Sequence, residues 1–297
     1  MIRELLEDAI RLSGELPGRA SDRSRLEEAA SLWIAYEPSP RELSEAGIDS
    51  GWNYRQLQGF YVYAVDAVSV ALDSSYVVEP RHEVGASDMS VRIRDRLVHD
   101  PNLFLEARGM EFEAALAVES SGRVDLVLLD GSLMARAYDS RSKSVTTLAE
   151  AVPELRSLPN AVFVAKRSQG TELLRGPLGD IHYFSRATQR AGFSAPCASQ
   201  GITHFYVRLG DFTEVLRVEV PGILDGAPPC SEARPEGDWP EVRRVVDSLA
   251  HGTVGGYPYV LQQAHERAHV SDEEMRALAE LAGAGYAETG REVLGER

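Results

Sequence analysis

The chain has 297 residues, of which 43% are apolar and 26% charged, a balance that suits a globular α/β protein with a large core. Its formal net charge of −15 argues against a broadly basic nucleic-acid-binding protein, so a polyanion has to be held by a local arginine-rich surface, by metal ions or by a partner. Two cysteines, Cys197 and Cys230, are too few for a disulfide framework or a cysteine zinc site, and no apolar run approaches the roughly 18 residues of a membrane span.

The N-terminal segment predicts helix. Apolar residues recur at helical spacing through residues 1–36, and the sequence Glu37-Pro38-Ser39-Pro40 ends the pattern. Residues 1–8 are amphipathic and charged, and they lack the apolar core of a signal peptide. We therefore expect a cytoplasmic protein.

Strands are expected next. A short strand over residues 46–49 leads into a loop at 50–53, and the Tyr- and Val-rich segment 60–72 predicts an interior strand because both of its faces are mostly apolar. Residues 88–98 and 103–119 predict helices.

The second half alternates strands and helices. Residues 124–129 form a continuous apolar run that predicts a buried central strand ending at Asp130, and residues 161–165 predict another that ends at Lys166. The remaining elements are a hairpin of 203–208 and 215–220, a loop over 222–238, and helices near 240–250, 258–269 and 272–283, the last with a Ser271/Glu274 capping box. This order predicts a mixed sheet covered by helices.

Acidic residues fall at the ends of the predicted strands. Asp49 closes the first strand, and Asp130 closes the most apolar one. The carboxyl ends of central strands are where sites form in open α/β sheets, and carboxylates gathered there suit Mg²⁺ or Mn²⁺. Two such ions, about 3.5–4 Å apart, are a common arrangement for phosphodiester hydrolysis. The alternative is that both aspartates only cap turns, since Asp-Gly and Asp-Ser are favourable turn sequences.

The chain resembles the archaeal NurA nuclease family across nearly its whole length. Seven segments carry the resemblance in order: Ile48-Asp49-Ser50, Arg108-Gly109-Met110-Glu111-Phe112-Glu113, Leu128 to Leu133, Val164-Ala165-Lys166-Arg167-Ser168, Gly179-Asp180, Arg217 to Pro221, and Gly256-Tyr257-Pro258-Tyr259 with Ala264-His265. The first motif is Asp-Ser-Gly here, whereas the family more often shows Asp-Gly-Ser.

The resemblance implies a ribonuclease-H-like fold and a DNA nuclease. It implies that Asp49, Glu111 and Asp130 bind two Mn²⁺ or Mg²⁺ ions, with His265 as a further ligand or proton-transfer group. It also implies 5′-to-3′ exonuclease activity on single- and double-stranded DNA and endonuclease activity on single strands. The resemblance further implies a homodimer that docks on a hexameric HerA-type translocase and resects DNA ends for repair by homologous recombination. The expected layout is a single NurA domain with a helical extension (1–40), a core (41–221) and C-terminal helices that complete the site (237–297).

The choice between two helix carboxylates rests on helix geometry. Glu111 and Glu113 point about 200° apart, so both cannot face the sheet. Glu111 is preferred because it is expected on the side of small alanine residues, and Glu113 is held as second choice. Asp66, inside the long strand, is a possible fourth carboxylate or the partner of an arginine.

Several other residues have both a functional and a structural interpretation. Lys166, one of only two lysines, suits a phosphate contact or a plain surface position, and Asp180 suits a site role or a helix N-cap. Arg217 is expected to form a cross-strand pair with Glu219 or to lie near the site. Candidate DNA contacts are Trp52, Arg167 and Arg217.

Two other functions are open. His265-Glu266-Arg267-Ala268-His269 matches the zinc-protease pattern H-E-x-x-H, in which His269 would be the second ligand, but that interpretation leaves Asp49 and Asp130 unexplained. The second alternative is a non-catalytic adaptor of the translocase, which would not need the acidic residues.

Overall fold

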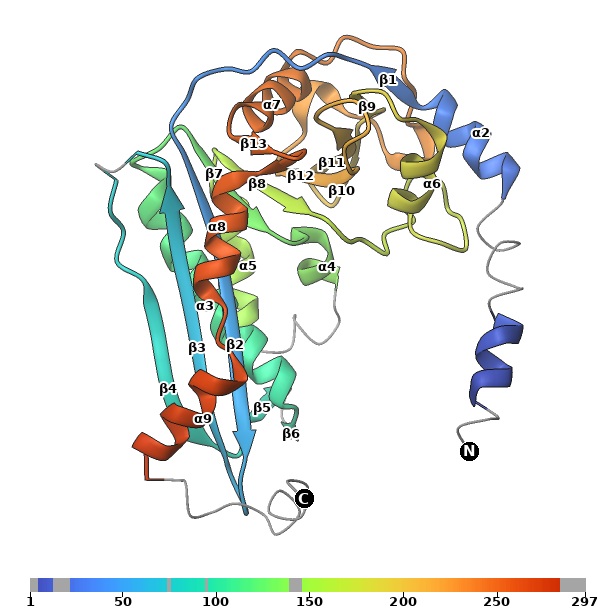
Figure 1. Cartoon of the computed structure of the whole chain (residues 1–297). Helices are drawn as coiled ribbons and strands as arrows, with labels where there is room; N and C mark the ends of the chain where they lie inside the picture. Colours follow the sequence, from blue (N-terminus) through green and yellow to red (C-terminus); the bar gives the residue numbers. More distant parts are fainter. Residues whose placement is uncertain (1–4, 13–21, 74–75, 94–95, 139–145, 284–297) are drawn as a thin grey trace. The chain divides into compact units, whose positions relative to one another are not determined.

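A computed structural model describes residues 5–12, 22–73, 76–93, 96–138 and 146–283 (Figure 1). The chain divides into two compact units. Unit 1 comprises Met1–Arg41 and Val164–Tyr257, and unit 2 comprises Glu42–Phe163 and Pro258–Arg297. Residues 258–281 pack on strands of the first half of the chain and belong to the same unit as those strands. In the described part of the chain, no helix is long and apolar enough to cross a bilayer.

The sheet of unit 2 is mixed, as the sequence predicted. Its strands follow the order β7 (Leu126–Asp130), β2 (Glu45–Gln56), β3 (Tyr61–Ala71) and β4 (Arg81–Ser87), and β8 (Ala161–Ala165) spans the boundary between the units. β2 runs parallel to β7 and antiparallel to β3. The expected loop at 50–53 is wrong, because these residues continue β2 and pair with β3 in unbroken register from Ala46 to Gln56.

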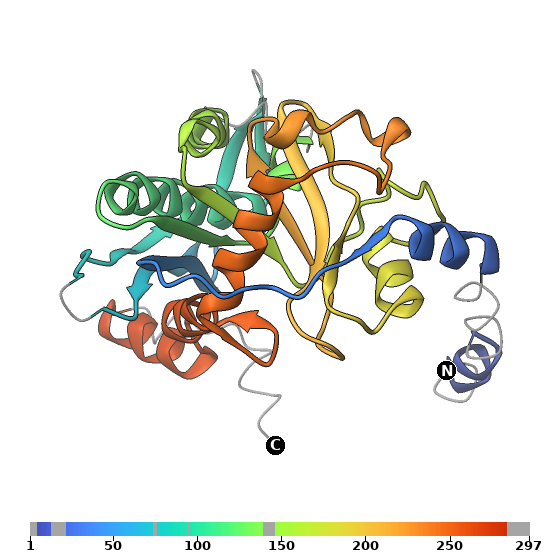
Figure 2. The ribbon, with the colours of Figure 1, turned by 90° about the horizontal axis from the view of Figure 1, so that it is seen from above.

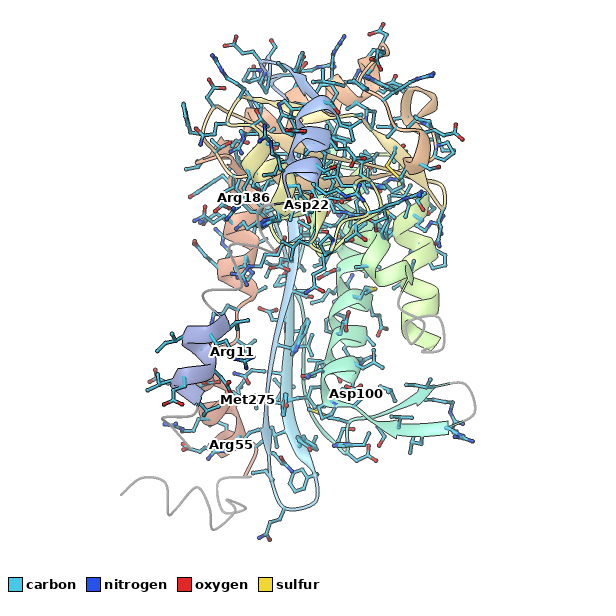
Figure 3. The ribbon with its side chains drawn as sticks, turned by 90° about the vertical axis from the view of Figure 1, so that its right-hand side faces the viewer. Arg11, Asp22, Arg55, Asp100, Arg186 and Met275 are labelled. Carbon is cyan, nitrogen blue, oxygen red and sulfur yellow. A yellow bond between two sulfur atoms is a disulfide. The ribbon has the colours of Figure 1, made fainter. Side chains whose placement is uncertain are left out.

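Helices cover both faces of this sheet. α3 (Pro101–Ser121) and α5 (Thr146–Ser157) pack together on one side, and α8 (Tyr259–Ala268) and α9 (Asp272–Leu281) lie on the other (Figure 2). Figure 3 shows Met275 of α9 beside the β2–β3 hairpin, which carries Arg55 near its far end. Met275 belongs to an apolar cluster with Val62 and Ala64, so the even-numbered row of β3 forms the contact with α9.

The expected helix over 88–98 is wrong. Its place is taken by the hairpin of β5 (Ser90–Ile93) and β6 (Arg96–His99), in which Val91 is paired with Val98. Apolar residues alternate with polar ones there, which is the strand period, and the helix begins only at Pro101 behind its N-cap Asp100. A short helix, α4 (Leu133–Tyr138), follows β7.

Unit 1 is built on antiparallel strands. They follow the order β1 (Trp33–Ala35), β9 (Gly192–Ser194), β11 (Ile202–Arg208) and β12 (Leu216–Pro221), with β10 (Cys197–Ser199) also paired to β11. The remaining elements are α2 (Arg23–Ser31), α6 (Asp180–Ala187), η2 (Leu224–Gly226), η3 (Cys230–Glu232), α7 (Pro240–His251), β13 (Thr253–Val254) and β14 (Tyr257–Pro258). The predicted β11–β12 hairpin is confirmed.

The N-terminal prediction is only partly right. Residues 5–12 and α2 are helical, but Trp33 belongs to β1 and pairs with Ser194 of β9, because its side chain packs on Phe184 rather than along a continuing helix. Residues 13–21 of the predicted helix lie outside the described residues.

The expectation for the cysteines is also wrong. Cys197 of β10 and Cys230 of η3 form a disulfide across 33 residues of sequence. The fold brings the two together because the backbone N–H of Ala198 donates to the carbonyl of Pro228, which holds the 222–238 segment against β10.

Candidate metal centre

Two strands of unit 2 place their acidic residues side by side. In the parallel pairing of β2 with β7, Ile48 is opposite Leu129, so the next residues of the two strands, Asp49 and Asp130, share one end of the pair. β7 stops at Asp130, whose carboxylate accepts the backbone N–H of Gly131 at 2.9 Å, and Gly131 turns the chain at φ +93°. The predicted position of both aspartates at a strand end of the sheet is confirmed for Asp130. Asp49 lies within β2, at the point where the neighbouring strand ends.

Helix α8 approaches β2 closely enough to add a third group. A Cβ atom on Gly47 would lie 2.5 Å from the backbone of Val260, and one on Gly51 would lie 2.2 Å from the carbonyl oxygen of Ala268. Only glycine allows this separation at both positions. Asp49 is between them on the same face of β2, so α8 brings His265 directly over its carboxylate.

The three groups meet in one cluster. His265 Nδ1 is 2.8 Å from Asp49 Oδ2, and Asp49 Oδ1 accepts the backbone N–H of Ser50 at 2.9 Å. One ligand atom from each of Asp49, Asp130 and His265 lies within 4.8 Å of the others. Asp49 is only 7% exposed, whereas the side chain of His265 is 69% exposed, so the cluster is closed toward the sheet and reached by solvent at the histidine.

The helix carboxylate at this site is Glu113. It is 2% exposed, and its carboxylate accepts the hydroxyl of Ser50 at 2.5 Å. Glu111 is exposed and pairs with Arg108 one turn earlier at 2.7 Å. The preference for Glu111 as the sheet-facing residue is therefore wrong. The buried face of α3 includes Gly109, Glu113, Leu116 and Ser120, and Gly109 allows the close approach to Ser50 that aims Glu113 at β2.

The pKa of Asp49 reflects the burial of its carboxylate and the negative charges near it. Burial, followed by the negative charges of Glu113 and Asp130, raises the pKa of Asp49 to about 6, while the hydrogen bond with His265 acts in the opposite direction. A divalent cation placed among the acids would offset both the burial and the repulsion. The donor set of carboxylate oxygens and one imidazole nitrogen fits Mn²⁺ or Mg²⁺, whose ligands are mostly oxygen.

Asp66 and His269 lie apart from this cluster. Both line a cavity of about 390 Å³ between β3, β4 and α9, where Asp66 is opposite His82 in the strand register. α8 ends at Ala268, and His269 has an extended backbone (φ −64°, ψ 123°). His265 and His269 are therefore not two ligands on one helix face, and the zinc-protease interpretation of H-E-x-x-H is wrong.

Lys166 and Arg167 follow β8 and belong to unit 1. Both are exposed, and they line a cavity of about 640 Å³ together with Arg186 and Arg208. The ammonium of Lys166 lies 3.6 Å from the centroid of the Tyr257 ring, a cation–π contact. The position of Lys166 at a strand end is confirmed, and its contact with a phosphate stays a prediction.

Asp180 and Arg217 are structural residues of the core of unit 1. Asp180 is fully buried and accepts the backbone N–H groups of Leu173 and Leu174 at 2.9 and 3.1 Å. It is therefore not the predicted N-cap, which is Gly179. Arg217, 1% exposed, donates to Glu219 at 2.6 Å and to Glu172 at 2.9 Å, so the predicted pair with Glu219 forms on one face of β12. A DNA contact of Arg217 is excluded by its burial.

Trp52 and Ser50 also lie on β2, close in sequence to Asp49. Trp52 is 38% exposed on β2, which leaves its proposed stacking on DNA bases possible in steric terms. Ser50 is a residue that the sequence did not single out, because it was assigned to a loop. The alternation of side chains along a continuous strand would have placed it opposite Asp49, on the face that α3 covers.

The fold and the site together define a class of protein. It is an α/β protein with a mixed sheet flanked by helices and an acidic cation site at the carboxyl end of a parallel strand pair. A family model described as the NurA domain matches residues 44–270. The chain belongs to the NurA family. No curated protein matches the chain.

Solved structures agree on the fold. The chain is similar to the NurA nuclease from Sulfolobus solfataricus, with 19% identity, a TM-score of 0.74, and coverage of 96% of this chain and 97% of that chain. A NurA structure bound to dAMP and manganese matches with 11% identity, a TM-score of 0.62 and coverage of 92% and 95%. Another, with manganese, matches with 11% identity, a TM-score of 0.61 and coverage of 94% and 98%. NurA is a family of nucleases, so the prediction of an enzyme is confirmed.

Proposed function

We propose that this protein hydrolyses DNA phosphodiester bonds with Mn²⁺ or Mg²⁺ held by Asp49 and Asp130. The observation that carries the proposal is the meeting of groups from β2, β7 and α8 within 4.8 Å of one another. The three segments are far apart in sequence, and the acids are unfavourable together unless a cation compensates them. A NurA protein bound to dAMP and manganese supports both the class of substrate and the ion.

Each residue has a separate task in this proposal. Asp49 orients the imidazole of His265 through Nδ1, so that the ring binds the cation or transfers a proton near the scissile phosphate. Glu113, held by the hydroxyl of Ser50, adds negative charge behind Asp49 and increases the attraction for cations. When bound, the metal activates water and stabilises the leaving oxygen, for which two ions per site are the proposed number.

An acidic protein needs a specific source of affinity for DNA, because its net charge repels the phosphates. With a net charge of −15, intrinsic affinity for DNA has to come from local cations such as those around Lys166 and Arg167 or from a partner. The proposed setting is a homodimer that receives DNA from a hexameric HerA-type translocase and resects broken ends for homologous recombination. The proposed activity is 5′-to-3′ exonuclease on single- and double-stranded DNA, with endonuclease activity on single strands.

The test of catalysis uses DNA labelled at either end, with Mn²⁺ and with Mg²⁺. Asp130→Asn and Asp49→Asn should each lower the cleavage rate at least about 100-fold, because a neutral amide no longer offsets the cation's charge. Asp66→Asn is the matched control, since it removes a half-buried carboxylate from the same sheet outside the cluster. The position of the label reports polarity.

Two results would contradict the proposal. Wild-type protein without metal-dependent cleavage would favour the adaptor alternative, and full activity in Asp130→Asn would place the chemistry elsewhere. Mixing the protein with a HerA-type hexamer in size-exclusion chromatography tests the partner separately, and the mass of the protein alone tests the homodimer.

A further inference from the structure

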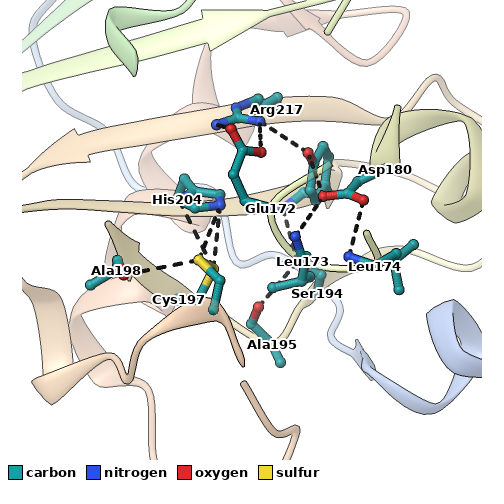
Figure 4. Close-up of a disulfide and its surroundings, with 12 residues drawn as sticks. Glu172, Leu173, Leu174, Asp180, Ser194, Ala195, Cys197, Ala198, His204 and Arg217 are labelled. Carbon is teal, nitrogen blue, oxygen red and sulfur yellow. Dashed lines mark hydrogen bonds and ion pairs between the residues drawn. A yellow bond between two sulfur atoms is a disulfide. The ribbon is translucent and has the colours of Figure 1, made fainter. Parts of the chain in front are cut away.

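A second cluster of potential metal ligands lies in unit 1 (Figure 4). Cys197 and His204 are fully buried, and Cys230 is half-buried. Nε2 of His204 faces both sulfur atoms, at 3.3 Å from Cys197 Sγ and 3.6 Å from Cys230 Sγ. This cluster shares no residue with the acidic site of unit 2, and its ligand types differ, since it offers sulfur and nitrogen instead of carboxylate oxygen.

The backbone holds the three side chains in place. Cys197 is directly opposite His204 in the β10–β11 pairing, which sends both side chains to the same face of the hairpin. Cys230 begins η3, and a bridge between Ala198 and Pro229 fixes that turn beside β10. Ligands that are placed by a hairpin and an adjoining turn need little rearrangement to bind an ion.

The separations match the geometry of a zinc site. With a Zn–S bond of about 2.3 Å and a Zn–N bond of about 2.0 Å, a sulfur and a nitrogen on one tetrahedral ion lie about 3.5 Å apart. The two observed sulfur–nitrogen distances, 3.3 and 3.6 Å, bracket that value. Only the two sulfurs are too close, because a disulfide joins them.

We propose that, once the Cys197–Cys230 disulfide is reduced, Cys197, Cys230 and His204 bind one Zn²⁺ ion, so that the same three side chains alternate between a covalent and a metal cross-link. A dithiol reductant supplies two electrons and two protons, the S–S bond breaks, and the reductant leaves as its own disulfide. Both thiols then lose their protons to solvent as the thiolates bind the ion, and His204 contributes its neutral nitrogen. Water takes the fourth position.

His204 is suited to this role by its surroundings. Burial and the nearby charge of Arg217 lower the pKa of His204 to about 3, while Glu172 acts in the opposite direction. The imidazole is therefore neutral at physiological pH, and its neighbours at Nε2 are sulfur atoms, which are weak hydrogen-bonding partners. A bound ion would give this buried nitrogen a strong partner. It would also keep the 222–238 segment attached to β10 when the disulfide is absent.

The experiment uses the full chain and Co²⁺ as a spectroscopic substitute for Zn²⁺. Protein reduced with a phosphine under anaerobic conditions is titrated with Co²⁺, and thiolate-to-cobalt charge-transfer absorption is recorded. We expect one Co²⁺ per reduced chain with this absorption, its displacement by Zn²⁺, and a higher Tm for reduced protein with Zn²⁺ than without. The disulfide-bonded protein should show no such absorption, which provides a comparison that needs no variant.

Variants separate this site from the acidic one. Cys230→Ser should lose the charge-transfer absorption, and Asp130→Asn should keep it, whatever its effect on DNA cleavage. The proposal is overturned if reduced wild-type protein shows no thiolate–cobalt absorption, or if Cys230→Ser, shown to be folded by circular dichroism, binds Co²⁺ as wild type does. Failure of the nuclease assay alone would leave this result unaffected.

Discussion

Asp49 keeps a carboxylate almost completely buried in the middle of a sheet, beside two other acids. Burial and the negative charges of Glu113 and Asp130 raise its pKa to about 6, whereas the hydrogen bond with His265 favours the charged form. An arrangement of this kind is costly for the fold by itself and favourable for binding a cation. At the scale of single residues, the site is therefore a group of neighbouring carboxylates that favours the binding of a cation.

Substitutions of Glu113 and Glu111 test whether buried negative charge beside Asp49 supports activity. Both residues carry the same carboxylate, but Glu113 is buried and Glu111 is exposed. Glu113→Gln should lower Mn²⁺-dependent cleavage by about 10- to 100-fold, because the buried negative charge beside Asp49 is lost. Glu111→Gln should change activity by less than about twofold, since it removes only an exposed pair with Arg108. Cleavage rates of the two variants, measured side by side, check this. The reverse order would restore Glu111 as the site residue.

Glu45, at the start of β2, carries another buried carboxylate, and within the described part of the chain neither of its oxygens has a hydrogen-bond partner. Burial raises its pKa to about 7. As pH rises from about 4.5 to about 7, the unfolded chain loses this proton while the folded protein retains it, so Glu45 lowers the free energy of unfolding over that window and keeps it lowered above.

We expect Glu45→Gln to remove this pH dependence. The variant should match wild type near pH 4.5 and exceed its free energy of unfolding by up to about 3 kcal/mol near pH 8. Urea denaturation at both pH values measures the difference. Equal stabilities of the two proteins at pH 8 would show that the ionised carboxylate is compensated.

The decisive contact between elements is that of α8 with β2. Gly47 and Gly51 bring the helix backbone against the strand, and this distance determines whether His265 reaches Asp49. On the other face, Gly109 allows α3 to bring Glu113 to Ser50. The site therefore depends on glycines at both helix contacts of β2: Gly47 and Gly51 of the strand itself toward α8, and Gly109 of α3 on the other face.

Gly47→Ala tests this contact. The added methyl group would lie 2.5 Å from the Val260 backbone, so α8 has to move or the protein is destabilised by about 1–3 kcal/mol. Metal-dependent cleavage should fall with it. Gly122→Ala, at the end of α3 with open space around it, is the matched control and should leave both quantities nearly unchanged. Thermal unfolding and cleavage rates are the measurements.

In this acidic protein, charged side chains form separate groups with different surroundings. In unit 2, ligand atoms of Asp49, Asp130 and His265 converge within 4.8 Å of one another. In unit 1, Glu172 and Glu219 converge on Arg217, which neutralises them inside the core. Lys166, Arg167 and Arg186 are exposed instead, and they form a local basic surface on a protein of negative net charge.

Substitution of Arg217 should therefore lower the stability of the protein, whereas substitution of Arg167 should weaken its binding to DNA. Arg217→Ala removes the cation that pairs with the buried Glu219 and the half-buried Glu172, and should cost about 3–5 kcal/mol of folding free energy. Arg167→Ala should leave stability within about 0.5 kcal/mol but weaken DNA binding and reduce its salt dependence. Denaturant unfolding and fluorescence anisotropy with labelled DNA compare them. Unchanged DNA affinity in Arg167→Ala at low salt would rule out this surface as a DNA contact.

The sequence by itself determined the elements whose signals are local. Continuous apolar runs predicted β7 and β8, helical spacing and caps predicted α3 and α7 to α9, and acids at strand ends identified Asp49 and Asp130 as candidates for one site. Asp49, Asp130 and His265 come together as the resemblance to NurA implied. These predictions hold because burial periodicity and capping depend on neighbours in the chain.

Only the tertiary structure decided the features that depend on distant segments. Ser50 to Asn53 contain no strong strand signal, yet pairing with β3 makes them strand; Glu113 rather than Glu111 faces the sheet because α3 is rotated to fit Gly109 against Ser50. Arg217 is buried because Glu172, 45 residues away, comes to it. Cys197 and Cys230 meet across 33 residues, a proximity that no local pattern encodes. Such outcomes follow from packing, which selects among faces and pairings that are locally almost equal in energy.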